Sequence, residues 1–337
     1  MNEQAKYTQF ALAREMMETP AILRGFRAGA IDAAAEAIRK AGRLFLTGEG
    51  SSRIFPAKNA MMHAMRRGLP VQIATEGGRQ AAEYRLDSFV VFGASNSGRT
   101  KEVISLFEAL GQAGHPHLYG LTANAGTKLE SLARQTFMLG CGKEDAVAAT
   151  KSVAEQALFY QTLLARLEQR SFEGNRDELA VAYDAALRAP IPAEMIAAIA
   201  QAGTIHFAGR NDGVAEELAL KTNEITRKAA DFLEGTYAVH GIEEVMDPRD
   251  VVIVVDPIVD EVSKFRDVLE KGVGMHVFAI SGRNTGLSTL QVPEAGEMDP
   301  YVFLAAGWNL LVEIGLYLDI NLDKAQRARK IGNEVVS

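Results

Sequence analysis

The sequence predicts an α/β protein made of two similar halves, each with a mainly parallel sheet whose two faces are covered by helices. Short apolar strands alternate with amphipathic helices, which is the pattern that buried parallel sheets require. A strand–turn–helix segment at 43–66 recurs at 204–227, which indicates an internal repeat. The chain of 337 residues is 47% hydrophobic and 23% charged, so it has the length and composition of two ordinary globular domains.

The first half begins after an N-terminal helical segment at 1–24, in which Pro20 is expected to separate two helical pieces. Residues 25–168 form the first predicted domain, which ends in a long helix at 152–167. Its apolar runs predict five strands, at 43–47, 70–75, 88–93, 117–122 and 135–139. The polar stretch that follows predicts a linker, which we place at 169–190.

The second half, at 191–337, repeats the pattern and ends in a C-terminal tail. Helices are expected at 214–229 and 301–318, and strands at 204–208, 251–255 and 276–280. Ligand sites in open α/β sheets lie at the carboxyl ends of the strands. The turns after these strands are therefore the candidate functional segments.

Composition and charge exclude several classes of protein. The net charge of −7 argues against a nucleic-acid partner, which normally meets a basic surface. The single cysteine, Cys141, rules out an intrachain disulfide and a cysteine-based zinc cluster, and the histidines lack metal-ligand spacing, so no metal is expected. Residues 1–6 lack the apolar core of a leader, and no apolar run reaches the ~20 residues that span a bilayer. We therefore expect a cytoplasmic protein without a membrane partner.

The turn Ser95–Thr100 is the strongest candidate site. It follows the apolar run 88–93 and precedes a predicted helix, and it holds three hydroxyl groups and one amide in Ser95, Asn96, Ser97 and Thr100. The N–H groups and partial positive charge of a helix N-terminus favour an anion. Such residues also suit an ordinary helix cap. The position at a strand's carboxyl end favours binding of phosphate or a similar anion.

Four segments, taken in order, resemble the double sugar-isomerase-domain (SIS) family. This family includes the isomerase half of glucosamine-6-phosphate synthase, amino-sugar-phosphate deaminases and fructosamine-phosphate deglycases. The segments are Gly48–Ser52, Ser95–Thr100, Ala146–Lys151, and Glu224 with His240–Gly241. The resemblance implies two three-layer α/β/α, flavodoxin-like halves of SIS type, preceded by the N-terminal helices. It also implies a small anionic sugar, a sugar phosphate, as substrate, and a homodimer whose sites are shared between subunits.

The resemblance further implies which residues bind the sugar phosphate. In the family, the Ser95–Thr100 turn holds the phosphate, the Ser52 position reaches the phosphate or a sugar hydroxyl, and main-chain atoms of a Val147–Ala148 wall contact the sugar. Glutamine is usual where this chain has Asn96, and serine is frequent where it has Ala149, so the sugar or its anionic group differs here. The implied substrate-binding residues are Gly50, Ser51, Ser52, Ser95, Asn96, Ser97, Thr100, Val147 and Ala148.

The implied catalytic residues are Glu224, His240 and Lys330. In the family, the carboxylate at the Glu224 position moves a proton between C1 and C2, and the histidine opens the sugar ring and often comes from the neighbouring subunit. The lysine of the synthase forms a Schiff base with the ketose. These roles suit a carboxylate base and an imidazole acid–base group. Each residue also has a structural interpretation: Glu224 as a helical ion-pair partner and His240 as a turn residue.

The expected function is a phosphosugar aldose–ketose isomerase that acts by C1–C2 enolisation. A deaminase or a deglycase that uses the same intermediates is the close alternative, and a non-catalytic sugar-phosphate sensor is the alternative from another class. Glutamine-dependent synthesis is not expected, because Met1–Asn2 leads almost directly into the sugar half without a glutaminase cysteine. No cofactor is expected, since Gly48-x-Gly50 lacks the third glycine and the acidic residue of a dinucleotide site.

Overall fold

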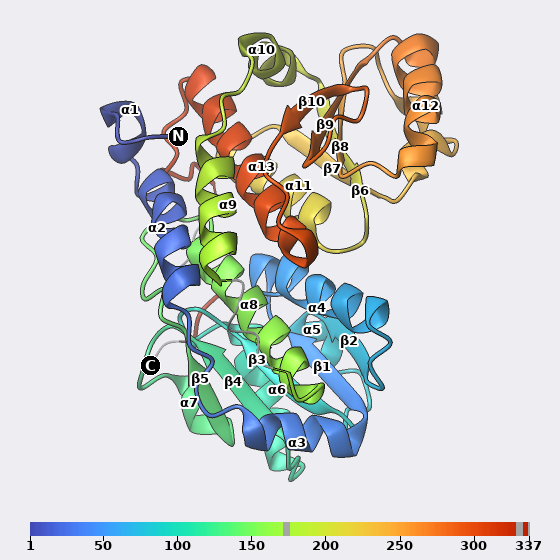
Figure 1. Ribbon diagram of the computed structural model, residues 1–337. Coiled ribbons are helices and arrows are strands. Elements are labelled where there is room, and N and C mark those ends of the chain that lie inside the picture. The colour runs from blue at the N-terminus through green and yellow to red at the C-terminus, as the bar shows by residue number, and fades with distance from the viewer. Residues whose placement is uncertain (171–175, 328–332, 336–337) are drawn as a thin grey trace. The chain divides into compact units, whose positions relative to one another are not determined.

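The structure, a computed structural model, describes residues 1–170, 176–327 and 333–335 and contains two compact units (Figure 1). We call them the first-sheet unit and the second-sheet unit. The first-sheet unit comprises Ala21–Asp145, Ala149–Arg176 and Arg327–Ser337, and the second-sheet unit comprises Met1–Pro20, Ala146–Ala148 and Asp177–Gln326. Both units are therefore assembled from segments that are distant in sequence.

The first sheet is entirely parallel, with the strand order β2-β1-β3-β4-β5. Residues of β3 and β4 are buried throughout, as expected for central strands covered on both faces. The edge strand β2 is only partly buried and is less apolar. The strands are β1 (Arg43–Thr47), β2 (Gln72–Glu76), β3 (Val90–Ala94), β4 (Leu118–Thr122) and β5 (Gln135–Met138).

Two groups of helices accompany this sheet. Helices α3 and α4 pack against α8, whereas α5 and α7 pack against α6. The chain moves outward from β1 to β2 and in the opposite direction from β3 to β4, so right-handed crossovers put α4 and α6 on opposite faces. The switch point lies between β1 and β3. The helices are α3 (Asp32–Ala41), α4 (Ile54–Arg66), α5 (Gly78–Ala81), α6 (Lys101–Gln112), α7 (Lys128–Leu132) and α8 (Lys151–Leu167).

The second sheet repeats this topology, with the order β10-β9-β8-β6-β7 and parallel pairing throughout. Helices α10 and α11 pack against α13, and the π-helix η6 packs against β9. The strands are β6 (Thr204–Gly209), β7 (Ala229–Glu234), β8 (Val251–Val255), β9 (His276–Ser281) and β10 (Ser288–Gln291). The helices are α9 (Arg176–Arg188), α10 (Ala193–Gln201), α11 (Val214–Thr226), α12 (Val262–Phe265), η6 (Arg266–Val273) and α13 (Asp299–Tyr317). The predicted fold class, two parallel α/β halves after N-terminal helices, is confirmed.

Helix α13 is the core helix of the second-sheet unit. Within the described part of the chain, the segment Gly296–Tyr317 alone is long and apolar enough to cross a membrane, but 83% of the relevant window is buried inside the protein. Trp308 and Tyr301 are completely buried. Burial of the apolar side chains inside the unit accounts for the composition of this helix.

Several local predictions from the sequence differ from the structure. Pro20 lies inside α2 (Ala11–Gly25), which follows the short α1 (Ala5–Thr8), and does not separate two helices. Proline removes one backbone hydrogen bond of the helix. Burial of Leu12, Met16 and Leu23 along α2 offsets the free-energy cost of that loss. Helix α9 occupies most of the stretch 169–190, where a linker is predicted. Helix α11 ends at Thr226, since Arg227 adopts a left-handed φ of 57° and the chain then enters β7.

Candidate functional site

The loop between β3 and α6, which we call the anion loop (Ser95–Thr100), is closed by its own hydroxyl groups. Ser95 Oγ and Thr100 Oγ1 lie 2.7 Å apart, and the N–H of Thr100 donates to Ser95 Oγ. The N–H of Gly98 donates to the Ser95 carbonyl. Ser95 is buried, whereas Ser97 is partly exposed. Ser95 therefore shapes the loop, and Ser97 is available to a ligand.

Gly98 is required by the geometry of this loop. Its φ of +64° is left-handed, and a Cβ atom here would lie 2.4 Å from the side chain of Thr127. Its carbonyl accepts a hydrogen bond from the N–H of Leu129, which ties the loop to α7. Only glycine combines this conformation with so close an approach. The loop is consequently held in one shape before any ligand arrives.

A pocket of about 460 Å³ opens beside the anion loop. This volume suits a small-molecule ligand. Of the predicted binding residues, Ser52, Asn96, Ser97 and Thr100 line it, while the pocket-lining residues do not include Gly50, Ser51 or Ser95. The other lining residues were not predicted from the sequence; they are Arg99, Asn124, Ala125, Thr127, Lys143, Glu144, Ala149 and Glu334.

Asn96 is held in place by two neighbours. Its Nδ2 donates to Glu144 Oε2 at 2.8 Å, and Asn124 Nδ2 donates to the Asn96 carbonyl at 2.7 Å. Glu144 also accepts from the N–H of Thr150 at 2.8 Å and from Ser152 Oγ at 2.5 Å. Glu144 thus joins the anion loop to the start of α8. One amide hydrogen of Asn96 is used internally, and the N–H groups of Ser95, Gly98, Arg99 and Thr100 also donate within the protein. The Ser97 hydroxyl and the N–H groups of Asn96 and Ser97 are therefore the donors that the loop can offer to an anion.

The turn after β1 contributes Ser52 to the same pocket. A Cβ atom on Gly48 would lie 2.7 Å from the Ser52 carbonyl, so glycine permits this tight turn. Gln156 Nε2 donates to that carbonyl and fixes Ser52 against α8. Because β1 and β3 flank the switch point of the sheet, the turn at 48–52 and the anion loop meet where open α/β sheets bind ligands.

The charges that line the pocket balance one another: Arg99 and Lys143 are opposed by Glu144 and Glu334. Glu334 belongs to the C-terminal segment Asn333–Val335. Its backbone forms an isolated antiparallel β-bridge with Thr100 of the anion loop. The N–H of Lys101 donates to the Asn333 carbonyl at 2.9 Å, and the N–H of Val335 donates to the Arg99 carbonyl at 3.0 Å. The first N–H of α6 is therefore already used by the C-terminal segment, and because the charges balance, an anion would be held mainly by neutral donors of the anion loop.

Glu224 lies on α11 of the second-sheet unit and forms an ion pair. Its Oε2 is 2.7 Å from Lys221 Nζ, and Lys221 Nζ is also 3.5 Å from Glu217 Oε1. The side chains of Lys221 and Glu217 are completely buried, whereas that of Glu224 is 33% exposed. The buried lysine orients the partly exposed carboxylate. The arrangement agrees with the structural interpretation and leaves one face of the carboxylate open to a substrate.

His240 is exposed and follows the 3₁₀-helix η3 (Tyr237–Val239). Its Nε2 lies 3.1 Å from Lys264 Nζ, and no hydrogen bond or ion pair in the described structure joins it to Glu224. Val147 and Ala148 group with the second-sheet unit, so their contact with a sugar stays a prediction. Lys330 lies outside the described residues. The structure therefore groups Ser52, Asn96, Ser97 and Thr100 around one pocket of the first-sheet unit. Glu224 and His240 belong to the second-sheet unit, and their catalytic roles stay predictions.

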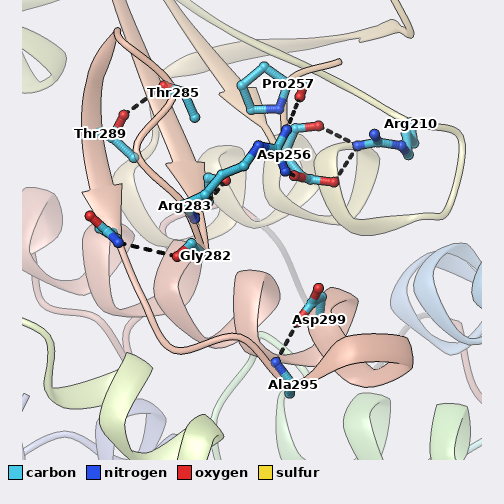
Figure 2. A network of polar contacts seen from close by, with 11 residues as sticks. Arg210, Asp256, Pro257, Gly282, Arg283, Thr285, Thr289, Ala295 and Asp299 are labelled. Atoms are coloured by element: carbon cyan, nitrogen blue, oxygen red, sulfur yellow. Dashed lines mark hydrogen bonds and ion pairs between the residues drawn. The ribbon is translucent and has the colours of Figure 1, made fainter. Parts of the chain in front are cut away.

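The carboxyl edge of the second sheet carries a different group of residues (Figure 2). Asp256, directly after β8, lies between two arginines: Arg210 Nη1 is 2.5 Å from its Oδ2, and Arg283 Nη1 is 2.7 Å from its Oδ1. Arg210 follows β6 and Arg283 follows β9. Arg283 also donates to the Pro257 carbonyl. The arginines at this edge therefore already hold an internal carboxylate.

Residues 37–166 match the SIS domain family, and this range contains the first sheet and the anion loop. The chain therefore contains a SIS domain in this range. The second sheet repeats the strand order of the first.

Similar proteins share this architecture. The chain is 28% identical over 315 residues to glutamine–fructose-6-phosphate aminotransferase (isomerizing) of Aeropyrum pernix, covering 85% of this chain and 49% of that protein. The SIS-domain chain thus spans about half the length of this relative. Tagatose-6-phosphate ketose/aldose isomerase from Escherichia coli aligns with a TM-score of 0.79 at 17% identity, covering 96% of this chain and 98% of the other. Glucosamine-6-phosphate deaminase from Thermotoga maritima aligns with a TM-score of 0.75 at 18% identity, covering 95% and 98%. These structural similarities describe the fold.

Proposed function

We propose that this SIS-domain protein is an enzyme that isomerises a phosphorylated sugar between aldose and ketose by enolisation at C1 and C2. The observation that carries the proposal is the pocket beside the anion loop. Ser52, Ser97 and Thr100 line it, and the loop geometry presents hydroxyl and N–H donors at the start of α6. Such donors suit a phosphate monoester, whose binding energy can position the remote reacting carbons.

In this proposal Glu224 removes the proton from one carbon and returns it to the other. Such a base contributes rate only if its carboxylate is ionised and held in place. The ion pair with buried Lys221 holds the carboxylate in place. The lysine has a second carboxylate partner in Glu217, which keeps its own charge compensated.

His240 is proposed to open the sugar ring, and Lys330 to form a Schiff base with the ketose. His240 is exposed and makes no hydrogen bond to Glu224, an arrangement that suits a ring-opening group supplied to the site of a neighbouring subunit. We accordingly propose a homodimer with shared sites, located in the cytoplasm. Removal of ammonia from an amino-sugar phosphate, or deglycation, would use the same enolised intermediates and is the alternative reaction.

The test is a panel of fructose 6-phosphate, glucosamine 6-phosphate and fructosamine phosphates, with ketose, aldose and ammonia followed over time. Interconversion of ketose and aldose without ammonia supports the isomerase. Release of ammonia assigns the deaminase or deglycase reaction. Binding of these phosphates without turnover of any of them would refute the enzyme proposal and leave a sugar-phosphate sensor.

A further inference from the structure

A second pocket of the first-sheet unit is lined by four arginines. It has a volume of about 610 Å³ and shares no lining residue with the pocket beside the anion loop. The loop before α3, the C-terminal end of α8 and the first residue of α9 form it. The four arginines are Arg27, Arg166, Arg170 and Arg176.

The charge of this pocket contrasts with the chain's net charge of −7. Asp32 is the one carboxylate among the described lining residues, so four guanidinium groups minus one carboxylate leave an excess of three positive charges. Asp32 pairs with Arg166. Arg170 is 3.8 Å from Glu168, which lies closer, at 2.7 Å, to Arg67 outside the pocket. Among the described residues, the carboxylates recorded in ion pairs with these four arginines are therefore Asp32 and Glu168.

Two of the guanidinium groups share a neutral acceptor. Arg27 Nη1 donates to the Phe26 carbonyl at 2.8 Å, and Arg176 Nη1 donates to the same oxygen. A carbonyl oxygen orients these groups but does not neutralise them. Two like charges held within reach of one atom repel each other, and an anion placed between them would relieve that repulsion. Guanidinium groups bind phosphate oxygens in a bidentate manner, which makes arginine the preferred residue for phosphate recognition.

We propose that this arginine-lined pocket binds a diphosphate ester at a site separate from the sugar-phosphate site. Three excess positive charges match the charge of a diphosphate better than that of a monoester. The volume exceeds what a diphosphate group alone fills, so an organic substituent is accommodated as well. The Asp32 carboxylate and the hydroxyl oxygen of Thr162, whose proton is donated to the Leu158 carbonyl, are hydrogen-bond acceptors for that substituent.

Calorimetric titration of the full chain with inorganic pyrophosphate and with orthophosphate tests the proposal. The titrations use a chain that carries Ser97→Ala, which weakens any binding of pyrophosphate at the anion loop. Low salt preserves the attraction between pyrophosphate and the arginines. In that background, Arg27→Ala or Arg170→Ala should weaken pyrophosphate binding by about tenfold or more, the loss expected for a charge-assisted contact. The control is Arg85→Ala, which removes the same charge from a side chain that is 95% exposed and lies outside the pocket. It should change the affinity by less than about twofold.

Pyrophosphate should bind more tightly than orthophosphate, and its affinity should fall as salt is added. Equal affinities in the Arg27→Ala, Arg170→Ala and Arg85→Ala variants would overturn the proposal, as would the absence of pyrophosphate binding. Arg170 is exposed, so its replacement keeps the test valid if Arg27→Ala lowers the melting temperature. The titration requires no sugar turnover, and failure of the isomerase proposal would leave its result unaffected.

Discussion

The carboxyl edges of the two sheets share a topology and differ in chemistry. Val90 of β3 pairs with Leu44 and Val251 of β8 pairs with Ile205, so Ser95 and Asp256 occupy equivalent positions directly after equivalent strands. After β3 the chain presents hydroxyl groups beside a pocket. After β8 it presents a carboxylate that two arginines bind. One edge has hydroxyl groups beside a pocket, and the other already contains a carboxylate that two arginines bind.

The two halves therefore have the same topology but use the loops after equivalent strands for different purposes. The hydroxyl-lined edge uses Ser95 and Thr100 to close its own loop and leaves the Ser97 hydroxyl beside the pocket, whereas the Asp256 edge uses its donors to hold three loops of the second-sheet unit together. Asp256 has a left-handed φ of 42°, so its backbone conformation is adapted to this internal role. In the proposed reaction, the anion loop binds the phosphate and Glu224 acts as the base.

The largest expected effect concerns Glu224, the proposed base. Glu224→Gln removes the proposed base but keeps the size and most of the shape of the side chain. We expect turnover to fall by roughly 10²–10⁴-fold, while sugar-phosphate affinity changes only a few-fold. Steady-state kinetics and calorimetric titration of the same variant check this. A loss of affinity as large as the loss of rate would assign Glu224 to binding instead.

The second prediction concerns Ser97 of the anion loop. Ser97→Ala should weaken binding of a sugar phosphate by about 1–3 kcal/mol, because a hydroxyl donor to a charged phosphate is lost from the loop. The matched control is Ser288→Ala on the exposed face of β10, which removes a hydroxyl from the other sheet and should leave KM unchanged. An unchanged KM for Ser97→Ala would place the phosphate elsewhere.

The third prediction converts the Asp256 edge into an open anion site. Asp256→Asn removes one charge, and asparagine tolerates the left-handed backbone at this position. Arg210 and Arg283 then lack a charged partner, so we expect a loss of about 1–2 kcal/mol in the free energy of unfolding. Phosphate or sulfate should restore part of the melting temperature in this variant and have a smaller effect on the parent chain. An Asp256→Asn variant with the melting temperature of the parent chain would show that the ion pairs of Asp256 with Arg210 and Arg283 do not stabilise the fold.

The smallest expected effect concerns the C-terminal segment that pairs with the anion loop. Glu334→Gln removes an exposed carboxylate from the pocket wall and should strengthen sugar-phosphate binding by roughly two- to fivefold, because like-charge repulsion at an exposed position is weak. Titrations at low and high salt measure the change, which should shrink as salt screens the charge. Weaker binding would mean that Glu334 contacts the sugar.

Comparison of the two edges also shows how much the sequence could reveal. The central strands were predictable because continuous apolar runs identify strands buried on both faces, and β1 lies at the predicted 43–47. The edge strands β7 and β10 have mostly exposed or partly buried residues and no continuous apolar run of buried residues, so they lack that signal. The helix predicted at 214–229 overlaps Ala229, the first residue of β7.

For the site, local residues were predictable and distant ones were not. The clustered hydroxyls of Ser97 and Thr100 identified the anion loop. Glu144 and Glu334 reach the same pocket from distant parts of the chain, and their sequence surroundings contain no motif for that role. Lys143–Glu144 lies one residue before the Ala146–Lys151 segment, which was the available signal. The hydrogen bond from the Asn96 amide to Glu144 was not predictable, because 48 positions of sequence separate the two residues.

The most direct test of the central claim is calorimetric titration with fructose 6-phosphate and with fructose. If the anion loop anchors the substrate through its phosphate, fructose 6-phosphate should bind at one site per chain, and fructose should bind at least about 100-fold more weakly, the loss expected for several charge-assisted hydrogen bonds. Asp256→Asn should leave this difference unchanged. Equal affinity for the two sugars would contradict the account.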